Sequence, residues 1–421
     1  MTEIRITVTN TSSTGGTFLT PFWFGAHDEG FDLFEIGDAA SPGLEAIAED
    51  GTFATIADEL LAADPEAQGG AVFGAGGPIA TGETASANLM LEDEGSRFLS
   101  LAAMILPSND AFIGTTEEVE LIDAEGNFLG TQMLTFLGED VYDAGTEVNT
   151  EMDAAFINQM GPNTGETEGG VITRHPGFIG SEGNPDGTPI ILGGTNAAGA
   201  FIDPIAADFT REGAQIATIT IEEVIAIEGT AGNDALTADG SVLQSVDGGD
   251  GTDSLTIDAA FDTLTISRIE GGFRIGSDEA RDIDVRNVET ITLSDQTLTL
   301  DDSESAATIF LLYQAVFGVD PDIEGHSFWN DAAVAGTGLG EISDAFAEVS
   351  DFDMSDSISF VGGLYDAALG REGDDEGVTF WSGLLDSGAA DEGDVLLAFA
   401  TAEEAQDLNA EALADGFLLF A

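Results

Sequence analysis

The chain has 421 residues, of which 43% are apolar and 27 are phenylalanine, so it can build hydrophobic cores for about two to four domains. Its 80 acidic residues face nine basic residues, all of them arginine, and the net charge is -71. The absence of lysine excludes P-loop nucleotide binding and Schiff-base catalysis, and the acidic surface argues against nucleic-acid binding. Such a surface repels itself, so we expect screening salt or calcium ions between carboxylates to favour the folded state.

The chain contains no cysteine, which excludes disulfides and thiolate metal sites. Its first residues, MTEIRITVTN, alternate like a strand and lack the basic and apolar regions of a signal peptide. No stretch approaches the roughly 18 apolar residues of a membrane-spanning helix. We expect a protein that does not span a membrane and that, if exported, uses no N-terminal signal peptide.

Residues 1–226 show the pattern of an all-β sandwich. Ile4, Ile6 and Val8 alternate with polar residues and predict a strand with one buried face. Further short β runs, separated by Gly, Asn, Asp and Pro, continue to about residue 224.

Helices and one long loop interrupt this pattern. Ser41 and Gly51 are the start and stop signals of a helix at residues 42–49, and a second short helix is expected after it. Residues 160–199 are rich in Gly, Asn, Thr and Pro and predict a long loop with one short strand at 170–172.

This region resembles the spondin N-terminal domain in its bacterial form. The resemblance rests on five segments in matching order: ITVTN (6–10), TPFWFGAHD (20–28), LFEIGDAASPGLEAIAEDG (33–51), LAAMILPSNDAFIG (101–114) and YDAGTEVNTE (142–151). It implies a jelly-roll-like sandwich, similar to lipid- and calcium-binding C2 modules, with a calcium site in its loops. It also implies a role in extracellular adhesion or matrix binding.

Two of these loops carry candidate calcium ligands. Asn109 and Asp110 follow a strand expected to be buried, and Asp143 and Glu147 lie on a glycine-containing loop. Calcium prefers hard oxygen ligands, so the two loops can converge on one ion. We predict Asp110, Asp143 and Glu147 as ligands, with Asn109 as a further candidate. In the alternative interpretation, Asn109, Asp110 and Asp143 only form Asx turns.

Residues 227–300 change to Gly-Asp repeats. The segment GGDGTDSLT (248–256) matches the nonapeptide G-G-x-G-x-D-x-U-x, and a second copy begins 19 residues earlier with Thr230 at the second glycine position. These copies resemble the haemolysin-type (RTX) calcium-binding repeats of secreted bacterial proteins. The resemblance implies a β-roll with Asp234, Asp250 and Asp253 as calcium ligands; alternatively the Gly-Asp loops are turns without metal.

Residues 301–408 show helical periodicity and an internal repeat of 52 residues, in which Gly318, Asp322 and Trp329 recur as Gly370, Asp374 and Trp381. The repeat resembles an uncharacterised bacterial domain with the pattern LYxAxxGRxxDxxGxxFW. Its aromatic residues either fill the core of each repeat or form a ligand cage.

The last residues, 409–421, end in DGFLLFA. This end is similar to the uncleaved tail signals of type I secretion substrates, although an amphipathic helix end would show the same pattern. We therefore predict export by a type I secretion machinery.

The combined prediction is a multidomain chain: an all-β sandwich (jelly-roll or C2-like), a small β-roll-like unit and an all-α repeat domain. The three histidines are scattered, so we expect no enzyme. The predicted function is a secreted calcium-binding adhesive or surface-associated protein, extracellular or on the cell surface, whose loops contact extracellular matrix, polysaccharide or a cell-envelope ligand. The alternatives are a secreted enzyme with the sandwich as its active domain and a calcium-assembled surface-layer or matrix structural protein.

Overall fold

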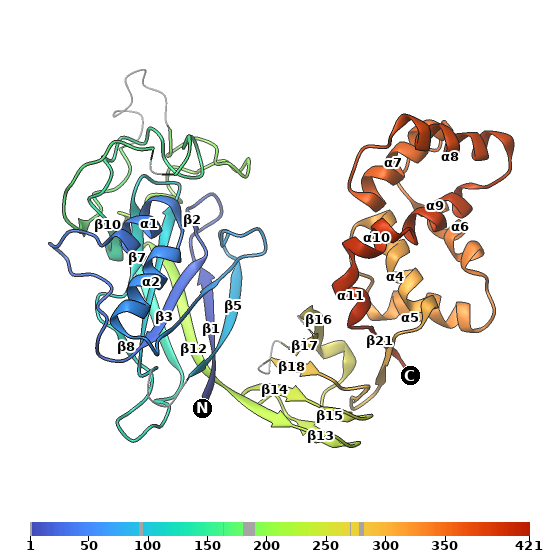
Figure 1. The fold of residues 1–421 in the computed structure, drawn as a ribbon, viewed down its shortest axis with the longest axis horizontal. Helices are drawn as coiled ribbons and strands as arrows, with labels where there is room; N and C mark the ends of the chain where they lie inside the picture. Colours follow the sequence, from blue (N-terminus) through green and yellow to red (C-terminus); the bar gives the residue numbers. More distant parts are fainter. Residues whose placement is uncertain (1, 92–95, 163, 180–189, 270, 278–281) are drawn as a thin grey trace. The chain divides into compact units, whose positions relative to one another are not determined.

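The computed structural model describes residues 2–91, 96–162, 164–179, 190–269, 271–277 and 282–421. The chain divides into two compact units, Met1–Val224 and Ile225–Ala421. The predicted segments 227–300, 301–408 and 409–421 all lie in the second unit. The β-rich first part and helical last part confirm the predicted fold class (Figure 1).

The first unit contains two antiparallel sheets. In the first sheet, β1 (Thr2–Asn10) pairs with β5 (Thr84–Leu91) on one side and with β12 (Gln215–Glu228) on the other, and β9 (Gln132–Leu137) pairs with β12. The second sheet has the order β11 (Thr173–Arg174), β10 (Val141–Asp143), β7 (Ala111–Gly114), β6 (Phe98–Leu106), β3 (Phe22–His27), β4 (Gln68–Val72). Two short strands, β2 (Phe18–Leu19) and β8 (Val119–Glu120), also pair with β6.

The core lies between the two sheets. Ile4, Ile6 and Val8 of β1 are fully buried, as their alternation predicts, and they share one cluster with Phe22 of β3 and Leu101 of β6. Because β3 and β6 are buried along their whole length, the second sheet must also be covered on its outer face.

Two helices provide this cover. Helix α1 (Pro42–Asp50) starts after Ser41, whose Oγ accepts a hydrogen bond from the Leu44 backbone N–H at 3.1 Å, and it ends at Gly51 in the left-handed region. Helix α2 (Ala54–Ala63) follows directly. Their apolar residues pack with Trp23 and Phe112 of the second sheet in a separate cluster. The predicted first helix is therefore confirmed, and its apolar side packs against the second sheet.

The segment after β10 has little regular structure. The short strand predicted at residues 170–172 lies instead at β11, Thr173–Arg174, because pairing with Tyr142 and Asp143 sets its position. A small hydrophobic cluster of Ala154, Ile191, Ile202 and Ala207 holds part of this segment together.

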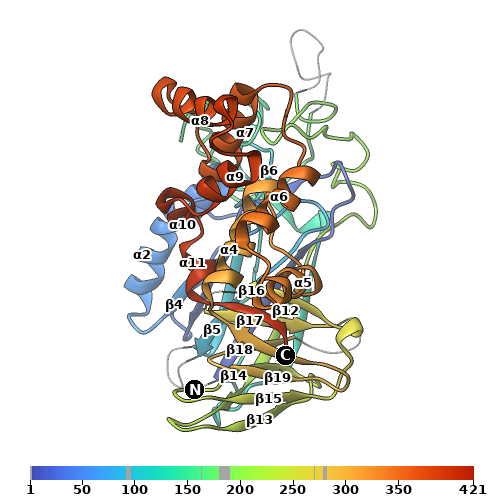
Figure 2. The same ribbon diagram turned by 90° about the vertical axis from the view of Figure 1, so that its right-hand side faces the viewer.

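The second unit begins with a stack of parallel strands. In one row β13 (Ala235–Ala238), β15 (Ser254–Ile257) and β19 (Thr290–Thr292) pair in parallel, and in another β14 (Leu243–Asp247) pairs with β18 (Ile283–Arg286) (Figure 2). Ala235 lies opposite Ser254, so the 19-residue offset of the two glycine-rich copies is the length of one coil. The hairpin of β16 (Thr265–Ile269) and β17 (Gly272–Gly276) is inserted between β15 and β18.

The helical part repeats one three-helix motif. The helices are α4 (Glu304–Phe317), α5 (Ile323–Val334), α6 (Leu339–Val349), α7 (Ser357–Leu369), α8 (Asp375–Ser387), α9 (Glu392–Ala400), α10 (Glu403–Leu408) and α11 (Ala410–Ala414). Gly318 and Gly370 end α4 and α7 in the left-handed region, with φ of 64° and 63°. Asp322 and Asp374 cap α5 and α8 by accepting hydrogen bonds from Gly325 and Gly377. Equivalent residues of the predicted repeat therefore have equivalent structural roles.

The repeated aromatic residues pack against one another. The Trp329 and Phe346 ring centroids are 5.4 Å apart, and those of Trp381 and Phe399 are 5.3 Å apart. Both pairs belong to one hydrophobic cluster of the helical part. These contacts agree with the prediction that the repeated aromatic residues fill the core of each repeat.

The C-terminal residues are part of the fold. Strand β21 (Phe417–Phe420) pairs antiparallel with β20 (Thr297–Asp301), which in turn pairs with β19. Phe417 and Leu419 lie in the core of the helical part, whereas Leu418 belongs to the core of the strand stack. Residues 409–421 thus contain a helix and the edge strand of this sheet; their role in export stays a prediction.

Candidate metal centre

The four predicted ligands of the sandwich come together at one end of the second sheet. Strands β7 and β10 are antiparallel neighbours, and Asp143 lies opposite Ala111. Asp110, which precedes β7, is therefore next to the loop that follows β10. Asn109, Asp110, Asp143 and Glu147 are 3%, 0%, 8% and 3% exposed. The sequence order alone did not require this burial, which comes from the helices and the long segment that cover the sheet.

Hydrogen bonds join the two loops. Asp110 Oδ2 accepts from the backbone N–H groups of Thr146 and Glu147, at 2.9 and 3.1 Å. Asn109 Nδ2 donates to Glu147 Oε2 at 3.4 Å, and Asn109 Oδ1 accepts from the Glu151 N–H at 3.0 Å. Asp143 Oδ1 accepts from the Gly145 N–H at 2.8 Å, which is the Asx turn of the alternative interpretation.

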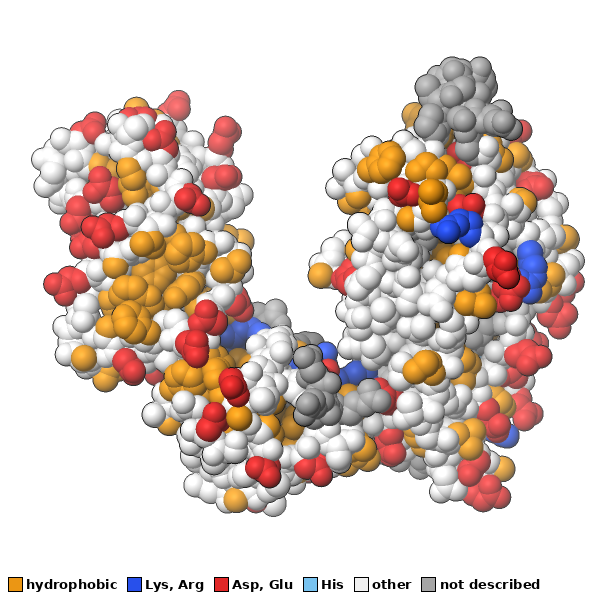
Figure 3. Space-filling model, turned by 180° about the vertical axis from the view of Figure 1, so that it is seen from behind, with side chains coloured by type: hydrophobic (Ala, Val, Ile, Leu, Met, Phe, Trp, Pro, Cys, Tyr) orange, Lys and Arg blue, Asp and Glu red, His pale blue; other side chains and the backbone are white. Residues whose placement is uncertain are grey.

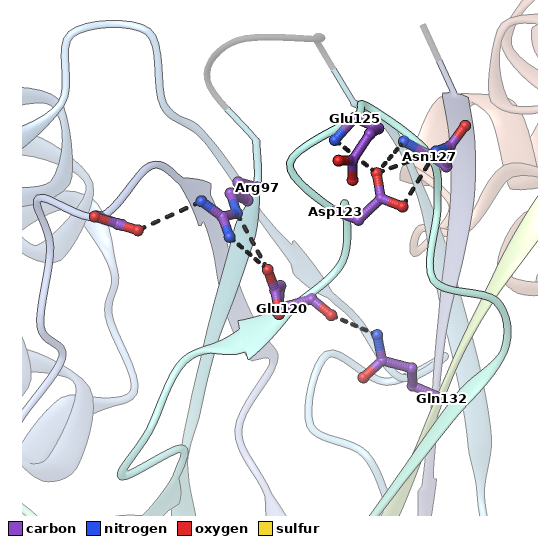
Figure 4. Close-up of polar contacts among 7 residues, drawn as sticks. Arg97, Glu120, Asp123, Glu125, Asn127 and Gln132 are labelled. Carbon is purple, nitrogen blue, oxygen red and sulfur yellow. Dashed lines mark hydrogen bonds and ion pairs between the residues drawn. The ribbon is translucent and has the colours of Figure 1, made fainter.

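One oxygen of this cluster has no partner. Asp110 Oδ1 is buried, and among the described residues nothing donates a hydrogen bond to it. By contrast, the exposed Asp123 accepts from the backbone of Glu125 and Asn127 and from the Asn127 side chain (Figure 4). Leaving a buried polar atom unpaired is costly, so Asp110 Oδ1 is the position where a ligand is most clearly needed.

A fourth carboxylate, which the sequence analysis did not select, borders the cluster. Glu49 lies in the last turn of α1 and is 3% exposed, and it is near enough to Thr146 and Glu147 for both residues to influence its pKa. The Thr146 hydroxyl also contacts Asp110 Oδ2 at 3.3 Å. The sequence shows no clear signal for this burial, because Glu49 lies four residues after Glu45, on the same side of the helix.

Burial makes the charged forms of these groups unfavourable. It raises the pKa of Glu49 to about 7, and burial together with the charge of Asp143 raises the pKa of Asp110 to about 6. Burial also raises the pKa of Glu147. No ion pair involves Glu49, Asp110, Asp143 or Glu147 within the described ranges; Arg97, for example, pairs with Glu120 and Glu29 (Figure 4).

A neutral histidine supports the Asp143 side of the cluster. The Gly177 N–H donates to His175 Nδ1 at 3.0 Å, so the proton is on Nε2, which donates to Asn149 Oδ1 at 3.0 Å. Asn149 Nδ2 in turn donates to Asp143 Oδ2 at 2.6 Å. Burial lowers the pKa of His175 to about 4, consistent with its neutral form.

The carboxylates are not arranged as a complete coordination shell. Within the part of the chain that the structure describes, no group of three or more Asp, Glu or His side chains is placed to hold a metal ion. Most carboxylate oxygens accept hydrogen bonds from the loops instead. Binding a cation here requires some of these side chains to rotate towards Asp110 Oδ1.

The strand stack of the second unit contains a related arrangement. Asp253 is 1% exposed, and its Oδ1 accepts from the Asp234 N–H of the preceding coil at 2.7 Å. Its Oδ2 is buried without a hydrogen-bond partner among the described residues. Glu289 of the following coil continues the series by accepting from the Asp253 N–H at 2.6 Å.

The other two predicted ligands of this stack are placed differently. Asp234 Oδ2 accepts from the backbone N–H and the hydroxyl of Thr230, at 2.7 and 2.8 Å. Thr230 replaces the second glycine of the nonapeptide pattern. Its hydroxyl therefore provides a hydrogen bond to the Asp234 carboxylate of the same coil. Asp250 is exposed at the tip of the turn. The structure therefore does not bring Asp234, Asp250 and Asp253 together around one point.

The three histidines lie in different parts of the fold. His27 Nε2 and Ser100 Oγ are 2.9 Å apart, but both residues are buried in the sandwich, and His27 Nδ1 contacts the Asp28 carbonyl oxygen at 2.7 Å. The remaining two histidines lie elsewhere, His175 beside Asn149 and His326 in α5.

A two-sheet sandwich with buried carboxylates in its loops, together with a helical repeat module, defines the class of this protein. Residues 19–162 match the family described as Spondin_N, and residues 341–409 match the family described as Domain of unknown function (DUF4214). Neither match spans half of the chain. The Spondin_N match confirms the predicted resemblance of the sandwich and points to an extracellular protein.

No curated protein matches the chain. The resemblance of the glycine-rich coils to RTX repeats stays a prediction. None of the helices within the described ranges is both long and apolar enough to cross a membrane.

Proposed function

We propose that this protein is a secreted, calcium-binding adhesive or surface-associated protein. Calcium bound at the Asp110 cluster would rigidify the loops after β7 and β10, and these loops would then contact an extracellular polysaccharide, matrix or cell-envelope ligand. The observation that carries the proposal is Asp110 Oδ1, a buried carboxylate oxygen without a partner among the described residues.

The chemistry of the cluster favours a divalent cation. A buried carboxylate is stable only when it is neutral, paired with a cation or bound to a metal. Asp110 and Glu147 have no ion-pair partner among the described residues, and hard oxygen ligands from carboxylates, amides and backbone carbonyls suit calcium. Asn109 supplies an amide oxygen at the same place. The ion would replace hydrogen bonds that now hold the loops together.

A second calcium position is proposed in the strand stack, at Asp253 Oδ2. The glycine turn passes beside this carboxylate, because a Cβ on Gly248 would lie 2.7 Å from Asp253 Oδ2. Calcium at this position would join neighbouring coils. Calcium is scarce inside cells, so a chain exported by a type I machinery would stay unfolded during transit and fold outside.

Calorimetric titration with calcium tests the proposal. We expect the wild type to bind, Asp110→Asn to lose the sandwich site, and Asp253→Asn to lose the site in the stack. Asp123→Asn is the matched control, because Asp123 is satisfied by its own turn and its loss should leave calcium binding unchanged. No calcium binding by the wild type, or equal binding by wild type and Asp110→Asn, would overturn the assignment of the sandwich site.

The adhesive role needs a separate measurement. We expect the wild type to be retained on immobilised acidic polysaccharide or matrix in calcium and to be released by chelator. The Asp110→Asn variant should be retained weakly in both conditions. Retention that does not depend on calcium would contradict the proposed mechanism.

A further inference from the structure

We propose that a cavity in the second unit binds a small organic anion with an apolar body, such as a medium-chain or aromatic carboxylate, and that Arg268 holds the anionic head. The cavity has a volume of about 360 Å³. Its lining residues differ from those of the proposed calcium positions, so this site goes beyond the proposed function and does not depend on it.

Five elements contribute the walls of the cavity. Arg268 and Phe273 come from the hairpin of β16 and β17, Phe310 from α4, His326 from α5 and Phe417 from β21. The Phe417 ring centroid lies 5.0 Å from that of Phe310 and 4.9 Å from that of His326. All three rings are buried. Packed side chains therefore form these walls, and such a cavity is already shaped for a ligand.

Arg268 places a positive charge among these rings. Its guanidinium carbon lies 5.2 Å from the centroids of both Phe273 and Phe417 and 5.9 Å from that of Phe310. Its Nη1 donates to the Gly416 carbonyl oxygen at 3.0 Å, which fixes the direction of the side chain. Only 18% of the Arg268 side chain is exposed, and hydrogen bonds from a cation to an anion are stronger where water is excluded. A guanidinium has five N–H donors, so it can bind an anionic head while it keeps the contact with Gly416.

The imidazole of His326 adds no second positive charge to the cavity. Burial lowers the pKa of His326, and its Nε2 donates to the Ala306 carbonyl oxygen at 2.9 Å, as a neutral ring can. The aromatic walls are continued by Ile266 and Ile323. A small inorganic anion would leave these apolar walls uncovered, whereas an anion with an apolar body would bury them. The lining thus favours an amphiphilic anion.

Two acidic residues also line the cavity, and both have donors in their own surroundings. Asp322 accepts from the Gly325 N–H at the start of α5, and Asp320 Oδ1 accepts from Gln314 Nε2 at 2.6 Å. The Asp320 side chain is 56% exposed, so water screens its charge, and its Oδ2 lies 3.9 Å from Arg268 Nε, beyond hydrogen-bond distance. A ligand carboxylate can therefore approach the guanidinium more closely than Asp320 does.

The test uses the full chain and two probes, the fluorescent apolar sulfonate 1-anilinonaphthalene-8-sulfonate and octanoate. We expect saturable binding of the sulfonate, with increased fluorescence, and its displacement by octanoate. Arg268→Gln should weaken the binding of both probes about tenfold or more, because it removes a hydrogen bond to a charged head. Arg371→Gln is the matched control: its guanidinium lies 5.0 Å from the Tyr365 ring centroid and pairs with Glu404, but it does not line this cavity.

A second variant tests the cavity without changing its charge. Ser267 is exposed and lines the cavity, so Ser267→Trp should fill it and abolish the binding of both probes while Arg268 remains. Thermal melting shows whether each variant is folded, and if Arg268→Gln does not fold, Ser267→Trp decides. Three results would overturn the proposal: a wild type that binds neither probe, an Arg371→Gln variant weakened as much as Arg268→Gln, or a folded Ser267→Trp variant that binds like the wild type.

Discussion

At the scale of single residues, the carboxylates of this protein fall into two groups. Most of the acidic residues that the structure describes are not buried, or they accept hydrogen bonds from their own turns, as Asp123 does. Glu49, Asp110 and Glu147 are buried among other acids without an ion pair in the described ranges. The first group sets the net charge, whereas the second group is where a cation would change the stability of the fold.

The buried group leads to a prediction on pH in the absence of calcium. The pKa values of Glu49 and Asp110 rise from 4.5 and 3.8 to about 7 and about 6 on folding, so the folded state holds protons that the unfolded state has released. Their contribution to stability is therefore complete at low pH and is lost as the pH rises through this interval. We expect the melting temperature in chelator to fall between pH 5 and pH 8, measured at constant ionic strength.

The double variant Glu49→Gln, Asp110→Asn is the comparison for that measurement. It cannot ionise at these two positions, so its melting temperature should fall less over the same pH interval. Calcium should reverse the effect of pH in the wild type alone, because the ion stabilises the charged carboxylates. Equal pH dependence of wild type and double variant would contradict the assignment of the two raised pKa values.

At the scale of secondary-structure elements, the helical repeats show how local signals control chain direction. Gly318 and Gly370 end α4 and α7 with positive φ, a conformation that costs a residue with a Cβ about 1 kcal/mol. Asp322 and Asp374 then start the next helix. These signals are local in the chain, which is why they could be read in the sequence.

A glycine pair tests this interpretation. Gly370→Ala should lower the melting temperature of the second unit by about 2–4 °C, because alanine is strained at that φ. Gly383→Ala, inside α8 and with no atom within 4 Å of the added Cβ, should leave stability unchanged or raise it slightly. Equal effects of the two substitutions in a thermal unfolding experiment would contradict the role of Gly370 as a helix end.

The last strand leads to a second prediction at this scale. Leu419 is 3% exposed in the core of the helical part, so Leu419→Ala should cost about 2–5 kcal/mol in the free energy of unfolding of the second unit. Leu408, which is 63% exposed, is the control, and Leu408→Ala should cost little. Chemical denaturation of both variants provides the measurement. A small effect at Leu419 would favour a loosely attached secretion tail over the observed strand.

At the scale of the whole molecule, repulsion between acidic side chains opposes folding. Acidic side chains are scattered over the face of the molecule that Figure 3 shows, whereas arginines are few. Screening shortens the range of this repulsion from about 30 Å at 0.01 M salt to about 3 Å at 1 M. We therefore expect sodium chloride to raise the melting temperature of the whole chain.

Calcium should act beyond screening. At equal ionic strength, millimolar calcium should raise the melting temperature more than sodium chloride does, because it binds the folded state at specific oxygens. Magnesium, which requires a stricter octahedral geometry, is the control and should have a smaller effect. Scanning calorimetry in the three salts checks this expectation, and identical curves would contradict specific binding.

The sequence by itself determined the features that depend on neighbouring residues. The alternation of Ile4, Ile6 and Val8 predicted β1, Ser41 and Gly51 predicted the ends of α1, and the repeated glycines and aspartates predicted the helical motif. The 19-residue spacing of the glycine-rich copies was visible as well, although its meaning as one coil came from the pairing of Ala235 with Ser254. These features are encoded locally because caps, turns and periodicity act over a few residues.

Only the tertiary structure decided which carboxylates are buried and which of them meet. Glu49 is far from Asp110 in the chain, and it is buried in a helix whose apolar residues pack against the second sheet. The Thr230 hydroxyl donates a hydrogen bond to the Asp234 carboxylate, which the nonapeptide pattern had predicted as a calcium ligand. Residue type determines whether a side chain can bind a cation, but burial and unpaired oxygens arise only from contacts between distant segments, and these contacts determine where a cation is needed.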